Sequence, residues 1–180
     1  MKLLKNDVVI FSTIMKKILA IACVIAGGMM SCSKQENKLP EGAIGYVVDK
    51  SANIDLSKKS MQALADGDSA TYRATYSEDA VFYDNTDTTT LDQNVSIFTA
   101  FKAKGIKMKL ESIPNITETI YNEKGYFDCD HFVYAYAWFT LTRGDKSVKV
   151  IIHSVDGIKD GKQVVEWLRY DTKKINEIMQ

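Results

Sequence analysis

The sequence predicts an α+β domain in which helices come first and an antiparallel sheet follows. Up to Gly105, apolar residues recur at helical spacing, and after it they alternate as they do in strands. Two tight turns, at 143–146 and 159–162, separate long strand-like runs. A run of helices followed by a run of strands packs with the helices on one face of the sheet.

The helical half is expected to contain three helices and one short strand. Asn53 or Asp55 can cap the first helix, and Gly67 ends it. The amphipathic third helix stops at Gly105, which favours the left-handed backbone of a helix end. Polar Asn, Asp and Thr residues before that helix indicate a loop. The expected order is helix to 65, helix 69–76, strand 80–83, loop 84–90 and helix 91–104.

The second half is expected to form a meander of long strands and one terminal helix. Pro114 interrupts the first strand, which therefore lies at an edge or carries a bulge. Asp171 can cap the terminal helix. The expected elements are strands 106–121, 126–142, 147–158 and 163–170, and helix 172–179.

The strand 126–142 presents two different faces. Small alanines leave room for helices or a ligand, so we assign their face inward: Phe127, Cys129, His131, Val133, Ala135, Ala137, Phe139 and Leu141. The other face then carries an aromatic stripe of Tyr134, Tyr136 and Trp138. Exposed aromatic surface of this size indicates an interface, so we expect a homodimer formed through the sheet. A bulge that inverts the alternation would instead place the stripe in the pocket.

The N-terminal region has the pattern of an export signal. Lys16 and Lys17 precede an uncharged run, 18–30, and the small residue Ser31 precedes Cys32. The segment Met29-Met30-Ser31-Cys32 resembles a bacterial lipoprotein signal, which implies a lipid on Cys32 and anchoring in the bacterial cell envelope. The expected organisation is signal peptide 1–31, lipidated Cys and tether 32–52, and domain 53–180. A plain signal peptide, an uncleaved anchor that includes residues 8–14, and a true start at Met15 stay open.

Charge and cysteine content exclude several classes of protein. Residues 1–31 carry four Lys and one Asp, so their removal leaves 19 basic and 22 acidic residues, a formal charge of −3. No basic surface for nucleic acid is therefore expected. Only Cys129 remains besides Cys32, so no internal disulfide can form, and Cys129 is expected to be a small buried hydrophobe rather than a catalytic thiol paired with His131. No metal, nucleotide or nucleophile-elbow motif is present, and we expect no cofactor.

Three segments resemble the nuclear-transport-factor-2-like fold, in its SnoaL-like and ketosteroid-isomerase-like branch. They are ALADGD at 63–68, YSEDAVFYD at 76–84, and the last hairpin from His153 to Asp171. Together they span roughly residues 55–178. The resemblance implies a cone: a strongly curved antiparallel sheet with the N-terminal helices packed on its concave face.

The resemblance also suggests site residues. Asp84 stands where the isomerases hold their proton-shuttling base, and His153 where they hold an oxyanion donor. Ser60 replaces their second donor, a Tyr, which makes steroid isomerisation doubtful. Two alternatives stay open: Asp84 opens the following loop, and His153 is a core residue. The expected pocket residues are Tyr83, His131, Phe139 and Trp167.

Three functions fit this sequence. The first is an envelope-tethered domain that binds a small hydrophobic molecule. The second is an enzyme for proton transfer, cyclisation or hydrolysis, with Asp84 as base and His153 as acid or oxyanion donor. The third is an interaction protein whose pocket is filled by side chains. Because one fold hosts many functions, the volume and lining of the pocket are needed to distinguish among the three.

Overall fold

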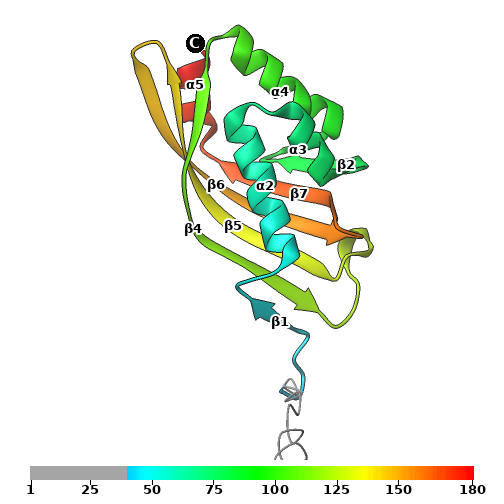
Figure 1. Cartoon of the computed structure of the whole chain (residues 1–180). Coiled ribbons are helices and arrows are strands. Elements are labelled where there is room, and N and C mark those ends of the chain that lie inside the picture. The colour runs from blue at the N-terminus through cyan, green and yellow to red at the C-terminus, as the bar shows by residue number, and fades with distance from the viewer. Residues whose placement is uncertain (1–39) are drawn as a thin grey trace, which may run out of the picture. The chain divides into compact units, whose positions relative to one another are not determined.

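One curved seven-stranded sheet organises residues 40–180, the part of the chain that the computed structural model describes (Figure 1). The strand order is β1-β4-β5-β6-β7-β2-β3. The elements are β1 (Gly45–Val48), α2 (Ala52–Asp66), α3 (Ser69–Thr75), β2 (Tyr76–Asp84), β3 (Asp87–Thr90), α4 (Leu91–Ala103), β4 (Lys107–Tyr121), the 3-10 turn η1 (Tyr126–Asp128), β5 (His131–Arg143), β6 (Lys146–Lys159), β7 (Lys162–Tyr170) and α5 (Thr172–Met179). This arrangement confirms the predicted α+β class. The predicted signal peptide, Cys32 and residues 33–39 of the predicted tether lie outside the described residues.

The helices begin and end where their capping residues dictate. Ser51, rather than the predicted Asn53 or Asp55, caps α2: its hydroxyl accepts a hydrogen bond from the Ile54 N–H at 3.0 Å. Gly67 ends α2 in the left-handed conformation, with φ of 70°. Asp171 caps α5 as predicted, accepting from the Lys173 N–H at 2.9 Å. Within residues 40–180, no helix is both long and apolar enough to cross a membrane.

Most of the long strands follow the prediction, but the rest of the sheet differs from it in three ways. Residues 87–90, predicted as loop, form β3 against β2, because successive threonines favour extended backbone. β1 lies within the predicted tether and pairs with the end of β4. The pair β2–β7 is parallel, an arrangement that the predicted antiparallel sheet did not include. The register of β4 against β5 shifts around Pro114, which confirms a bulge there.

The predicted strand 126–142 starts later than expected. Phe127 and Asp128 both have φ of 58°, and this left-handed backbone breaks the strand before His131. Phe127 is therefore not an inward residue of β5. Its ring packs instead against Tyr83 and Trp167.

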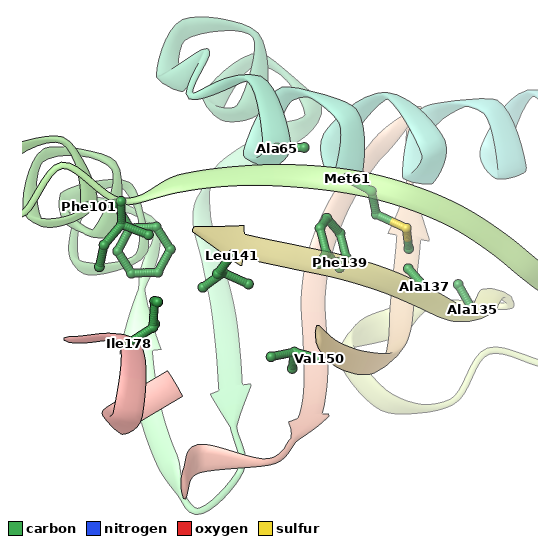
Figure 2. Packing of buried hydrophobic residues seen from close by; sticks show 10 residues of the cluster. Met61, Ala65, Phe101, Ala135, Ala137, Phe139, Leu141, Val150 and Ile178 are labelled. Atoms are coloured by element: carbon green, nitrogen blue, oxygen red, sulfur yellow. The ribbon is translucent and has the colours of Figure 1, made fainter. Parts of the chain in front are cut away.

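The two faces of β5 have opposite environments, which confirms the predicted alternation from Val133 onward. Helices α2, α3 and α4 cover one face, which we call the inner face, and leave the other, the outer face, open (Figure 1). Ala137 and Phe139 on the inner face are each 1% exposed, whereas Tyr136 and Trp138 on the outer face are 42% and 39% exposed. Figure 2 shows the inner residues packing toward Met61 of α2, Phe101 of α4 and Ile178 of α5. This packing fixes the helices over the sheet and leaves space between them.

Candidate functional site

A cavity of about 70 Å³ lies between the inner face of the sheet and the helices. This volume is several times what one water molecule needs, about 10–15 Å³, and roughly half that of a ~150 Å³ cavity that binds benzene. The cavity therefore accepts a few non-hydrogen atoms as it stands. Its wall is mostly apolar: Met61, Leu64, Ile97, Phe101, Met108, Ala137, Phe139, Ile152, Leu168 and Ile175. Its polar residues are Ser60, Tyr72, Tyr76, Asp84, Asn94, Ser154, Glu166 and Tyr170.

Two carboxyl groups stand side by side at this inner face. Asp156 on β6 lies directly opposite Glu166 on β7, so both side chains project from the same face of the sheet. Asp156 is 0% and Glu166 6% exposed. The Tyr76 hydroxyl donates a hydrogen bond to Glu166 Oε2 at 2.9 Å, whereas neither carboxyl oxygen of Asp156 has a hydrogen-bond partner. Glu166 lines the cavity, and Asp156 lies next to it.

Both carboxyls of this pair hold a proton more tightly than usual. Burial raises the pKa of Asp156 to about 7, although the nearby hydroxyls of Ser57 and Ser154 oppose the shift. Burial also raises the pKa of Glu166 well above its usual value, and the charges of Asp156 and Asp84 add to the effect. Like charges this close resist simultaneous ionisation, so the pair titrates as a unit and retains a proton near neutral pH.

Asp84 places another carboxyl group on the cavity wall, separate from the Asp156–Glu166 pair. It ends β2, and its Oδ2 accepts a hydrogen bond from the Tyr170 hydroxyl at 3.0 Å. Its Oδ1 is buried and has no partner. Burial, followed by the Asp84 contact, raises the pKa of Tyr170, so that phenol stays protonated as a donor. The Oδ1 atom is thus a free acceptor in an apolar cavity.

A separate polar cluster lies under the start of α2, away from the cavity. Glu118 on β4 is 1% exposed, and its Oε1 lies 2.6 Å from both Asn53 Nδ2 and His131 Nδ1. Burial by itself raises the pKa of Glu118, but hydrogen bonds from Ser51, Asn53 and His131 outweigh it and leave the pKa below its usual value. This buried carboxylate is ionised, and its Oε1 atom links α2 to the sheet through Asn53, whereas its Oε2 atom has no hydrogen-bond partner.

Aromatic side chains gather on the outer face. Trp167 on β7 stacks on Tyr83 of β2, with ring centroids 5.7 Å apart, and Phe132 lies beside it. A shallow groove of about 460 Å³ runs over this end of the sheet, lined by Tyr121, Glu123, Gly125, Tyr126, Phe132, Tyr134, Val155 and Trp167. The Tyr134 hydroxyl lies 3.3 Å from that of Tyr121.

The structure separates the residues that the sequence placed in one site. Asp84 and Phe139 line the cavity. The predicted position of His153 beside Asp84 is wrong: His153 lies opposite Tyr136 in the β5–β6 pairing and stacks on that ring at 4.4 Å, on the outer face. Tyr83 and Trp167 also lie on the outer face, and His131 belongs to the Glu118 cluster, so none of the three lines the cavity.

Sequence reasoning missed Asp156 and Glu166. Their signal was present, because Asp156 continues the alternation of the inward residues Val150, Ile152 and Ser154 along β6. An acid in that register is unusual and indicates a site. The resemblance to the isomerases instead pointed to His153, one residue away from the inward position.

The described residues show no cluster built for a metal ion. In 40–180, no three or more His, Cys, Asp or Glu side chains come together in a way that could hold one. Cys129 is free and buried, and burial raises the pKa of its thiol. The polar side chains that line the cavity carry carboxyl, hydroxyl and amide groups.

Solved structures share this arrangement at low sequence identity. An LEH-like epoxide hydrolase from M. tuberculosis is 15% identical, with 71% of this chain and 89% of that chain covered and a TM-score of 0.54. An NTF2-like protein from Burkholderia xenovorans is 11% identical over 72% of this chain and 96% of its own, with a TM-score of 0.51. A proposed polyketide cyclase from Pseudomonas putida is 12% identical over 71% and 98%, with a TM-score of 0.52.

No protein-family model matches the chain, and no curated protein matches it. The likeness to solved structures therefore establishes the fold and leaves the activity open. The domain has the nuclear-transport-factor-2-like fold that the sequence resemblance indicated.

Proposed function

We propose that this domain binds a small, mainly apolar molecule in the cavity between the sheet and its helices. The main support for the proposal is a mostly apolar cavity with unpartnered polar atoms, Asp84 Oδ1 and Ser154 Oγ, on the residues that line it. Leaving buried polar atoms without partners costs about 1–3 kcal/mol each, so a ligand that satisfies them gains affinity. Most ligand sites combine an apolar wall with a few such polar groups.

A matched pair of isoleucines tests this proposal. Ile152 lines the cavity, and its neighbour Ile151 is 38% exposed on the outer face. Native mass spectrometry of the purified protein should show a retained small molecule. The Ile152→Phe variant, which fills the cavity, should lose that molecule, and Ile151→Phe should keep it. A protein that arrives empty and binds none of a library of small apolar compounds contradicts the proposal and supports a filled-pocket interaction protein.

A second candidate function is acid–base catalysis on the bound molecule. The specific observation is the Asp156–Glu166 pair, in which burial raises the pKa of Asp156 to about 7. A pair that holds one proton near neutral pH can donate it to a substrate and accept one back. The similar structures include proteins named as an epoxide hydrolase and a proposed polyketide cyclase, activities that involve proton transfer. Here Asp84 and Glu166 would be the groups in reach of a substrate.

Turnover separates catalysis from binding. Incubation with small aliphatic epoxides should give diols, formed by addition of water across the opened C–O bond. Glu166→Gln should abolish diol formation, and Glu177→Gln, on the exposed side of α5, should not. Retained ligand binding without turnover of epoxides or other acid-labile substrates contradicts the enzyme and leaves the binding proposal in place.

We further propose that the domain is exported and held at the bacterial cell envelope by a lipid on Cys32. The support is the signal-like sequence at 16–32 and the polar residues that follow it. The protein should partition into the detergent phase of a cell extract, and Cys32→Ala should move it to the aqueous phase. Intact mass should show the acyl chains. Equal partitioning of both forms contradicts the lipid anchor.

We also propose that two copies of the domain form a homodimer through their outer faces. Tyr136, Trp138 and Ile151 are each more than one third exposed, and they lie next to one another on paired strands. Contiguous exposed apolar surface favours association with a second copy of the same face. Light scattering should report a dimer that Trp138→Lys dissociates. A monomer at concentrations near 100 μM contradicts this proposal and leaves the cavity proposal untouched.

A further inference from the structure

We propose that the ligand of the cavity carries a protonated amine, held by the acidic and acceptor groups of the cavity wall while its apolar part fills the remaining space. The inference rests on the proposed binding function and names the chemical class of its ligand. A neutral or anionic ligand would contact the same apolar wall, but it would not complement the polar groups of the cavity equally well. The choice among the three classes depends on which donors, acceptors and charges the cavity leaves unmatched.

The unmatched groups are mainly acceptors. Asp84 Oδ1 on the cavity wall, both oxygens of Asp156 beside it, and Ser154 Oγ are buried and have no hydrogen-bond partner. Ser154 is 1% exposed and lines the cavity. The lining phenols already have acceptors: Tyr76 donates to Glu166, and Tyr170 donates to Asp84. An ammonium group supplies three N–H donors and no acceptor, which complements this inventory.

The charges point in the same direction. Asp84 and Glu166 line the cavity and Asp156 stands opposite Glu166, whereas no Lys, Arg or His is among the lining residues. Buried carboxylates without a cation are costly, and the pair avoids that cost by keeping a proton. A bound ammonium ion can replace this proton, because it supplies the missing positive charge together with its hydrogen bonds.

The competing ligand classes fit less well. A carboxylate would add a negative charge to an uncompensated acidic site. A ketone or ether offers only acceptors, so it could use the proton of the carboxyl pair but would leave Asp84 Oδ1 unpartnered. An alcohol supplies one donor and no charge. An amine is therefore expected to be preferred over an alcohol of the same shape.

The affinity for an amine should rise with pH. Alkylamines stay protonated up to pH 9, while Asp156 loses its proton as the pH passes about 7 and so adds negative charge to the Asp156–Glu166 pair. The titratable groups facing this pair are Tyr72 from α3, Tyr76 and Asp84 from β2, and Tyr170 from β7; α2 contributes only Ser57 and Ser60. The phenols hold their protons in this range, because burial raises the pKa of Tyr72, Tyr76 and Tyr170. The carboxyl pair therefore sets the pH dependence.

Three molecules of similar shape test the inference: 3-methylbutylamine, 3-methylbutan-1-ol and 3-methylbutanoate. Binding is followed by the NMR shifts of methyl groups in the purified protein. Ile152 and Ile175 line the cavity and report entry, and the exposed outer Ile151 serves as the internal control. We expect the amine to bind at least tenfold more tightly than the alcohol at pH 8, with the difference shrinking at pH 5.5. Glu166→Gln and, independently, Asp84→Asn should each reduce the affinity for the amine to that for the alcohol. Asp79→Asn, at an exposed residue of β2, should leave the affinity for the amine unchanged.

The outcomes distinguish this inference from the function on which it rests. Equal affinities for amine and alcohol, or tighter binding of 3-methylbutanoate, overturn the amine inference while the binding proposal stands. Shifts at Ile152 and Ile175 from none of the three compounds overturn both. If Glu166→Gln fails to fold, the pH dependence of the wild-type protein decides: an amine affinity that does not rise between pH 5.5 and pH 8 overturns the inference.

Discussion

Two buried carboxyl sites beneath α2 differ in their supply of hydrogen-bond donors. Glu118 and Asp156 are 1% and 0% exposed, so water reaches neither. Asn53 and His131 each approach Glu118 Oε1 at 2.6 Å, so only the Oε2 atom of Glu118 lacks a partner, whereas both Asp156 oxygens are without one. The pKa of Glu118 is consequently lowered, and burial raises that of Asp156 to about 7.

This difference separates a structural acid from a functional one. A buried carboxylate with its donors in place contributes to stability, because its partners replace water. A buried carboxyl without donors opposes folding, so it is expected where a ligand or a reaction supplies what is missing. Burial alone does not identify the site; the balance of donors and acceptors does.

The largest change in the free energy of unfolding is expected for a substitution of Glu118, the structural acid. Glu118→Ala leaves Asn53 and His131 without their shared acceptor and should destabilise the protein by about 3 kcal/mol. Urea denaturation at pH 7 measures the change, with Glu78→Ala at an exposed residue of β2 as control, expected within about 0.5 kcal/mol. Equal effects of the two substitutions would remove the structural role assigned to Glu118.

A smaller change in the free energy of unfolding, of opposite sign, is expected for a substitution of Asp156. Asp156 binds a proton more tightly in the folded than in the unfolded protein, so its contribution favours folding at low pH and is lost as the pH rises from about 4 to about 7. Asp156→Asn removes this loss and should raise the free energy of unfolding at pH 8 by on the order of 2 kcal/mol. Denaturation curves at pH 4.5 and pH 8, with Asp79→Asn as control, measure it. A variant less stable than wild type at pH 8 contradicts the comparison.

The smallest effect is expected from the hydroxyl of Tyr76. Tyr76→Phe deletes the 2.9 Å hydrogen bond to Glu166 Oε2, which should cost about 1 kcal/mol and raise the pKa of Glu166 further. The amine affinity at pH 7 should fall, because a larger fraction of the carboxyl pair is then protonated. Tyr46→Phe, in the exposed β1, is the matched control. An unchanged affinity would show that Tyr76 does not tune the pair.

Much of the fold could be predicted because it depends on local signals. Alternation and turn residues located the long strands and identified the inward face of β5. The left-handed residues of η1 and the pairing of β1 with β4 depend on tertiary contacts, which periodicity does not encode. The same is true of the Ser51 cap, which competes with two equally suitable neighbours.

The site was harder to predict because an error of one residue along a strand moves the chosen side chain to the opposite face of the sheet. The turn that pairs Arg143 with Lys146 also pairs Tyr136 with His153. Counting back along that hairpin would have placed His153 on the outer face with the aromatic stripe and Ser154 and Asp156 inside. Motif spacing ignores this register, whereas the position of Asp84 follows from the alternation of its own strand. The pairing of Asp156 with Glu166 requires the second hairpin as well.

The titration of the carboxyl groups, followed by ¹³C NMR of protein labelled at Asp and Glu side chains, tests the central claim most directly. We predict one buried carboxyl resonance that titrates near pH 7 and disappears in Asp156→Asn, and another, absent in Glu118→Ala, that titrates below the usual range of Glu. Titration of every carboxyl below pH 5 would contradict the account, because the cavity would then hold no proton-sharing pair.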